Sequence, residues 1–138
     1  MSNQLQTISF FGTVGAGVNL TLVSQRISLP FKTKKIRASF APGVNRLMRL
    51  YFFISLDPTA PTLTPPQGVD ILKSIGQVTY LTGDEEFKEI PHEVLYSSRG
   101  GYIKVYAVNS DVFEHTIDCQ VTIEYIQDND HPEIKETS

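Results

Sequence analysis

The chain has 138 residues, a single cysteine and a formal net charge of −3 at pH 7. This length is typical of one domain that folds without disulfide bonds, and one cysteine excludes an intramolecular disulfide. No apolar run approaches a membrane-spanning helix, and the first residues lack the regions of a secretory signal peptide. We therefore expect one soluble domain at 1–126 and a polar, disordered tail at 127–138.

Alternation of apolar and polar residues with a period of two dominates the chain, and it is typical of half-buried β-strands. A weak strand is predicted over 5–11. Between 18 and 31 the apolar residues change from even to odd positions, which requires a bulge or turn near 24–26. Residues 34–40 alternate clearly. Residues 47–56 are apolar on both faces, so this strand is central or meets a partner on its second face.

The middle of the chain is irregular. Four prolines in 57–68 keep this segment out of a sheet and predict an extended, exposed loop. If the loop acts as an arm, we expect it to pack on a neighbouring subunit. Residues 69–74 are the one candidate for a short helix, and weaker strands fit 76–82 and 91–96.

The clearest strands come last, at 102–108 and 116–125. In the second of these, Cys119 belongs to the apolar face, which predicts a buried and inert thiol. About eight strands separated by turn signals predict an all-β, antiparallel β-sandwich of the jelly-roll kind. The alternative is an immunoglobulin-like sandwich.

Charge is distributed unevenly along the chain. Residues 1–56 hold seven basic residues and no acidic one, whereas 57–138 hold the other five basic residues and all 15 acidic ones. We interpret this division as electrostatic complementarity between copies of the protein or with an acidic partner, the alternative being a plain solvated face. An isoelectric point near 5.5 argues against nucleic-acid binding.

A candidate interaction surface collects basic and aromatic residues that the alternation places on strand faces turned away from the core. Its apolar part would exceed what a solitary monomer leaves in water. The alternative is that the second sheet or a long loop covers it. The members of this surface are Lys35, Arg37, Arg49, Tyr51, Phe53, Tyr102, Lys104 and Tyr106.

Catalytic and metal-binding patterns are absent from the sequence. His115 and Cys119 lie on the same strand face but about 13 Å apart, too far to share one ion, and His92 and His131 add no zinc-site spacing. No Gly-x-Ser-x-Gly elbow occurs, and the glycine-rich segment 12–17 leads into a strand rather than a helix. We therefore expect no enzyme activity, no metal and no cofactor.

The closing segment GYIKVYAVNSDVFEHTIDCQVTIEYI, in which Asn109-Ser110-Asp111 turns one amphipathic strand into the next, resembles small β-sandwich structural proteins of tailed phages and virus-like particles. This resemblance implies a non-enzymatic protein that assembles as a homo-oligomer, as a trimer or higher ring, with a capsid or other particle protein as a further partner. It implies a location in a virion or the cytoplasm. The alternative function is a carbohydrate- or ligand-binding β-sandwich module, and no membrane partner is expected.

Overall fold

The computed structural model describes residues 4–62, 64–74, 80–91 and 93–126. The predicted tail at 127–138 and most of the predicted strand at 76–82 lie outside these residues. The described part of the chain forms nine strands and one short helix: β1 (Leu5–Val14), β2 (Asn19–Val23), β3 (Phe31–Phe40), β4 (Met48–Ser55), β5 (Val69–Asp70), α1 (Ile71–Ser74), β6 (Glu86–Ile90), β7 (Leu95–Tyr96), β8 (Tyr102–Asn109) and β9 (His115–Tyr125).

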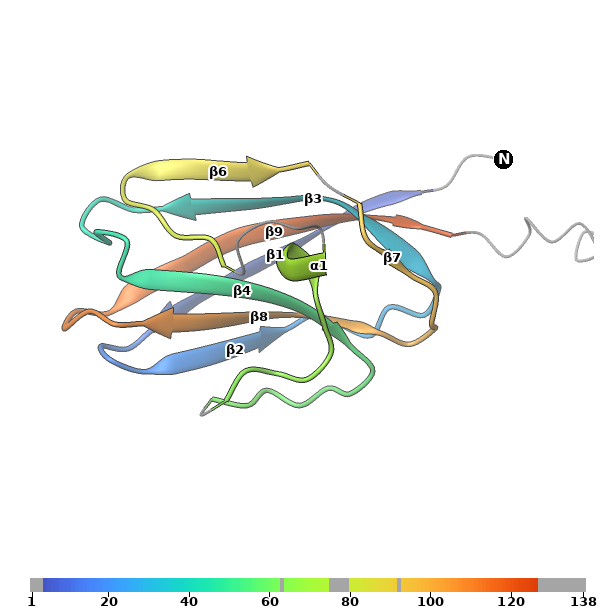
Figure 1. Cartoon of the computed structure of the whole chain (residues 1–138), viewed down its shortest axis with the longest axis horizontal. Coiled ribbons are helices and arrows are strands. Elements are labelled where there is room, and N and C mark those ends of the chain that lie inside the picture. The colour runs from blue at the N-terminus through green and yellow to red at the C-terminus, as the bar shows by residue number, and fades with distance from the viewer. Residues whose placement is uncertain (1–3, 63, 75–79, 92, 127–138) are drawn as a thin grey trace, which may run out of the picture.

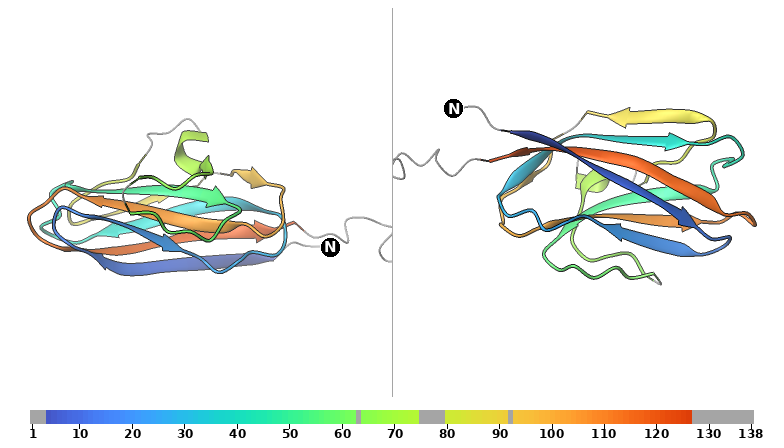
Figure 2. Two further views of the ribbon diagram at one scale, coloured as in Figure 1. Left: turned by 90° about the horizontal axis from the view of Figure 1, so that it is seen from below. Right: turned by 180° about the vertical axis from the view of Figure 1, so that it is seen from behind.

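The strands form two antiparallel sheets packed face to face (Figures 1 and 2). Sheet A has the order β1-β9-β3-β6, with β7 paired to one end of β3, and sheet B has the order β2-β8-β4-β5. This arrangement confirms the predicted β-sandwich and is that of a jelly roll, in which the chain passes repeatedly between the two sheets. An immunoglobulin-like order would instead place the first two strands in one sheet.

The core lies between the sheets and is filled by the inward face of each long strand. On β4 the even-numbered residues point inward, and Phe52 is fully buried among them. On β9 the odd-numbered residues do so, and Cys119 is 2% exposed between Phe10 of β1 and Ala38 of β3. The predicted burial of Cys119 is therefore confirmed, and burial raises the pKa of its thiol to about 12.

Two irregularities in the strands adjust which side chains face the core. β2 ends at Val23, and pairing resumes only where Ile27 meets Gly101, so the predicted break near 24–26 is confirmed. In β3 the register with β9 shifts between Thr33 and Lys35, which leaves Lys34 as the extra residue of a β-bulge. In the part of the chain that the structure describes, no helix has the length and hydropathy needed to cross a bilayer.

Candidate functional site

The sandwich has two outer faces, and the candidate interaction surface is divided between them. Lys35 and Arg37 belong to β3 and therefore to sheet A. They lie on its outer face, because Ile36 between them is buried in the core. Arg49 lies on β4, which is part of sheet B, where its guanidinium stands over the ring of Tyr80 at 5.1 Å from the ring centre. The expectation that Arg49 joins Lys35 and Arg37 is wrong, because β3 and β4 belong to opposite sheets.

The remaining predicted residues do meet, on the outer face of sheet B. Tyr51 of β4 lies opposite Tyr106 of β8, and Phe53 lies opposite Lys104. The ring centres of Tyr51 and Tyr106 are 5.9 Å apart, within the range of a favourable aromatic pair. Tyr102 lies opposite Ser55 one step further along the same ladder. β4 and β8 thus align these side chains on one face of sheet B.

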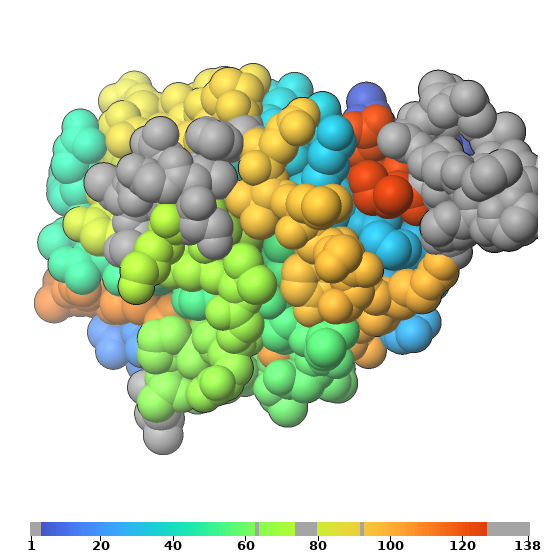
Figure 3. Space-filling model, turned by 45° about the vertical axis from the view of Figure 1, so that its right-hand side comes forward, coloured from blue at the N-terminus to red at the C-terminus, as the bar shows by residue number. Residues whose placement is uncertain are grey.

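Part of this face carries the chain's own residues 57–62 and 64–68, here called the strap (Figure 3, green). The hydroxyl of Thr21 on β2 donates a hydrogen bond to the carbonyl of Pro61, which ties the strap across sheet B. On this face Lys104 is 0% exposed, Tyr106 4% and Phe53 7%. The predicted exposure of these three residues is therefore wrong. The strap bonds to Lys104 and to Thr21, which lies opposite Tyr106, so a loop lies on this part of the face, in line with the alternative.

An ion pair fastens the start of the strap. The ammonium of Lys104 donates a hydrogen bond of 2.9 Å to Oδ1 of Asp57, which gives a fully buried cation the counter-charge that it needs. Hydrogen bonds from Thr59 and then from Lys104 lower the pKa of Asp57 to about 2. The expectation that this loop packs on a neighbouring subunit is wrong for the described residues of the strap, because these bonds hold it on its own domain.

The basic and acidic parts of the sequence pair within one chain. Both Lys32 and Lys34 lie within 4 Å of Glu93 and Glu124, and the bond from Lys34 lowers the pKa of the Glu93 carboxyl. Arg37 and Arg46 have acidic partners on β6, at 3.5 Å and 3.3 Å. Complementarity between copies therefore cannot be inferred from these charges, because their carboxylate partners are already present in the same molecule.

The outer face of sheet A stays open and carries two cross-strand rows of side chains. In the first row Phe11 lies opposite Asp118, and Ser39 lies opposite Phe87. Because Ala38 pairs with Cys119, Ser39 and Asp118 stand at the same level. The second row, one step along the strands, is polar throughout, and it consists of Ser9, Gln120, Arg37 and Glu89.

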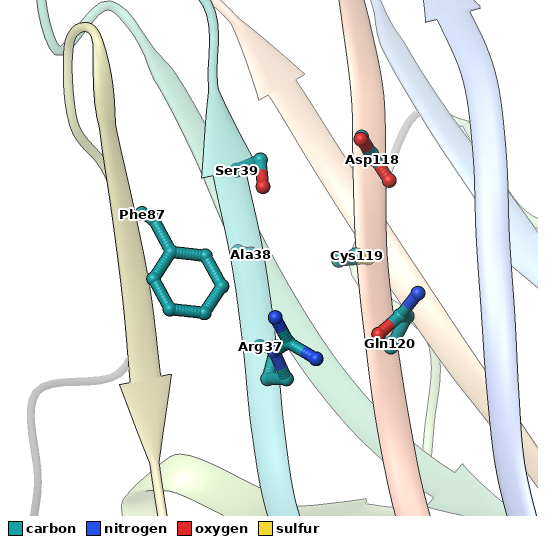
Figure 4. Close-up of a pocket in the computed structure, with 7 residues that line it drawn as sticks. All are labelled: Arg37, Ala38, Ser39, Phe87, Asp118, Cys119 and Gln120. Atoms are coloured by element: carbon teal, nitrogen blue, oxygen red, sulfur yellow. The ribbon is translucent and has the colours of Figure 1, made fainter.

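A hollow of about 120 Å³ lies between these rows, with Phe87, Ser39 and Asp118 on one side and Arg37 and Gln120 on the other (Figure 4). The guanidinium of Arg37 stacks on the Phe87 ring at 4.7 Å from its centre. Its Nε is buried, lies 3.5 Å from Oε1 of Glu89 and makes no hydrogen bond. A second hollow, of about 260 Å³, shares Ser39 and Asp118 and continues to Phe11.

Metal-ligating side chains do not gather in the described residues, where no group of three His, Cys, Asp or Glu could hold an ion. The His115 imidazole pairs instead with Asp111, at 2.7 Å between Nε2 and Oδ2, and this contact lowers the pKa of the Asp111 carboxyl. His115 is thus directed to a turn carboxylate, whereas the Cys119 thiol points into the core.

Sequence analysis did not select Phe11, Phe87, Asp118 and Gln120 for the candidate surface. A signal for Phe11 was present, because adjacent residues in a strand face opposite sides and Phe10 and Phe11 cannot both enter the core. Phe87 gave no such signal, because its strand was not predicted.

No protein-family model and no curated protein matches the chain. Among solved structures, the infectious bursal disease virus VP2 subviral particle aligns with a TM-score of 0.51 and 12% identity, over 89% of this chain and 33% of that chain. The Yersinia pseudotuberculosis-derived mitogen aligns with a TM-score of 0.41 and 9% identity, over 89% and 87% of the two chains. TmCBM61, in complex with beta-1,4-galactotriose, aligns with a TM-score of 0.41 and 6% identity, over 88% of each.

These likenesses concern the fold. The VP2 alignment places the chain among jelly-roll-like β-sandwiches. The aligned region corresponds to about a third of the VP2 chain. At 12% identity the alignment transfers no residue and no activity to this chain.

Proposed function

We propose that the chain is a non-enzymatic structural protein that self-associates through one end of its sandwich. The observation that carries this proposal is a group of exposed apolar side chains on three neighbouring turns, at 15–18, 41–47 and 110–114 (Figure 1). Val112 and Phe113 are 78% and 68% exposed at the tip of the last turn. The group, here called the apolar end, consists of Val18, Leu47, Val112 and Phe113.

The three turns are joined to one another by hydrogen bonds. The backbone N–H of Ser110 donates to the carbonyl of Leu47 at 2.9 Å, and that of Asn109 donates to the carbonyl of Val18 at 3.2 Å. The side-chain amide of Asn109 donates to the carbonyls of Gly15 and Phe113. The apolar end is therefore held in one shape before any partner arrives, which lowers the entropic cost of association.

Apolar side chains left in water are the main driving force for such an association. Burial of a Val, Leu or Phe side chain is worth roughly 1.5–3 kcal/mol when it is complete. Copies arranged around a rotation axis that passes close to the apolar end would each bury the same group there, so every copy added increases the buried apolar surface. This supports a homo-oligomer, and the resemblance of the closing segment extends the proposal to a ring on a virion or other particle surface.

Analytical ultracentrifugation over a range of protein concentrations tests the proposal. We expect a defined oligomer for the wild type and a monomer for Phe113→Asp, because a carboxylate cannot be buried in the interface without a partner. Leu95→Asp is the matched control, because Leu95 is equally exposed (65%) on β7, away from the apolar end. A wild-type monomer at high micromolar concentration, or an oligomer unaffected by Phe113→Asp, contradicts the proposal.

A further inference from the structure

We propose that the open outer face of sheet A binds a neutral oligosaccharide along the two cross-strand rows described above, here called the track. One row runs from Phe11 to Phe87 and the other from Ser9 to Glu89. This inference is independent of self-association, because the apolar end lies on the turns and the track lies on the sheet. Phe11 is 73% and Phe87 51% exposed. β1 and β6 are the outer strands of four, so the two rings stand about 14 Å apart across the sheet.

The rings and the hollows supply the shape that a sugar chain requires. Sugar rings present flat C–H faces that pack on aromatic rings, and an exposed ring at each end of the track offers two such contacts. The two hollows between the rings both border on Ser39 and Asp118, so they lie next to each other and form a row of depressions from Phe87 to Phe11. Its length suits an oligosaccharide rather than a single sugar.

The polar side chains between the rings supply partners for hydroxyl groups. Asp118 can accept hydrogen bonds, the Gln120 amide can both donate and accept, and Ser39 offers a hydroxyl. The guanidinium of Arg37, which lines the first hollow, offers N–H donors to a sugar hydroxyl. Stacking on Phe87 and the ion pair with Glu89 hold this guanidinium in place before a ligand binds.

Other classes of ligand fit these residues less well. A nucleic acid or another polyanion is disfavoured, because the track combines one cation, Arg37, with two carboxylates, Asp118 and Glu89. An apolar peptide face would leave the side chains between the rings without hydrogen-bond partners, which is costly. A neutral ligand with many hydroxyl groups satisfies both the rings and the polar groups between them.

Nuclear magnetic resonance of the ¹⁵N-labelled full chain tests this inference directly. The probes are cellotriose, mannotriose, beta-1,4-galactotriose and tri-N-acetylchitotriose, each titrated to 20 mM, roughly the upper limit of weak ligand binding. We expect at least one of them to shift the Arg37 Nε–H signal and the Gln120 side-chain amide in a saturable manner.

Variants separate the track from a general surface effect. Phe87→Ala and Phe11→Ala should each weaken binding by roughly tenfold, the loss expected for one aromatic contact. Arg37→Lys keeps the positive charge but removes the planar guanidinium that stacks on Phe87 and lines the hollow, so it should also weaken binding. Leu5→Ala is the matched control, because Leu5 is exposed on the same face of β1 but four residues beyond Ser9, the last residue of the track on this strand. The affinity of this variant should equal that of the wild type.

Three outcomes overturn the inference. The first is the absence of saturable shifts with all four oligosaccharides. The second is a set of shifts that maps outside the track, or that Phe87→Ala and Phe11→Ala leave unchanged. The third is a change in the same signals with protein concentration alone, which would make a second copy the occupant of this face. None of these outcomes depends on Phe113→Asp, so a failure here and a failure of the proposed function are distinguishable.

Discussion

Replacement of Asn109 by alanine should destabilise the fold more than any other single change of a polar side chain in the described turns. Asn109 is 2% exposed at the end of β8. Its Nδ2 lies 2.9 Å from the carbonyl oxygen of Phe113, 3.1 Å from that of Gly15 and 3.3 Å from that of Val14. Its Oδ1 accepts a hydrogen bond of 3.0 Å from the backbone N–H of Asp111. One side chain therefore joins the β1–β2 and β8–β9 turns.

The size of the effect follows from these bonds. An amide group has two N–H bonds, so the three carbonyls share two donors, and the bond to Oδ1 makes a third interaction. At a net value of roughly 0.5–1.5 kcal/mol each, Asn109→Ala should lower the free energy of unfolding by about 2–4 kcal/mol. For a domain of this size that corresponds to a fall of roughly 10 °C in Tm.

Urea denaturation followed by circular dichroism measures this loss. The dependence of the free energy on urea should stay unchanged, because the surface exposed on unfolding is nearly the same. Ser110→Ala is the control, because the Ser110 side chain is exposed in the same turn, and its effect should remain within about 0.5 kcal/mol. A loss below 1 kcal/mol for Asn109→Ala would refute the argument that these hydrogen bonds join the turns.

Asn109→Asp adds a test by pH. A carboxylate can only accept hydrogen bonds, so it would face the carbonyl oxygens of Val14, Gly15 and Phe113 without a donor. The fold should then favour the protonated form and raise the pKa of the new carboxyl above its value in the unfolded chain. The variant should therefore be most stable below the unfolded pKa of about 3.9 and lose stability as the pH rises through the folded pKa. An opposite trend, relative to the wild type, would contradict this account.

Three further predictions concern the thiol, the strap and metals. Cys119 should react with a thiol reagent far more slowly in the native chain than in urea, and Cys119→Ser should cost about 1–3 kcal/mol; rapid native labelling would contradict its burial. The pKa of Asp57 is lowered from 3.8 to about 2. The ionised Asp57 carboxylate therefore stabilises the fold fully above a pH of about 3.8, and this stabilisation is lost as the pH falls through 2. The difference in unfolding free energy between the wild type and Asp57→Asn should therefore shrink over that interval, and a constant difference would exclude the ion pair with Lys104. Finally, a chelator should leave the Tm unchanged, and a fall would reveal a structural metal.

The long strands of sheet A could be predicted from the sequence because each has one buried and one open face. In β9 this produces strict alternation, and in β2 the change of parity after Val23 correctly indicates an interruption. β6 was not predicted, because its pattern is inverted. The large apolar residue Phe87 points to solvent, whereas Glu86 and Lys88 take the half-buried side. Only pairing with β3 makes this segment a strand, and that pairing is a long-range contact.

The candidate site was predicted only in part, and the reason is geometric. Alternation shows which residues of a strand share a face but not which sheet the strand enters, so Arg49 was placed beside Lys35 and Arg37. The strap was recognised by its prolines. Its position depends on a hydrogen bond to Thr21 and an ion pair with Lys104, neither of which has a local signal in the sequence.

Because β9 lies between β1 and β3, the chain cannot complete sheet A until its last strand has been synthesised. Thr7 and Thr122 share a hydrogen bond although 115 residues separate them, so the first long strand acquires its partner only when the last one has emerged. Until then β1 and the β9-facing edge of β3 present unpaired backbone, which invites pairing with other chains. Ribosomal stalling or truncation before Tyr125 should therefore produce aggregates rather than a smaller folded domain, and folding should be slow for a chain of this length.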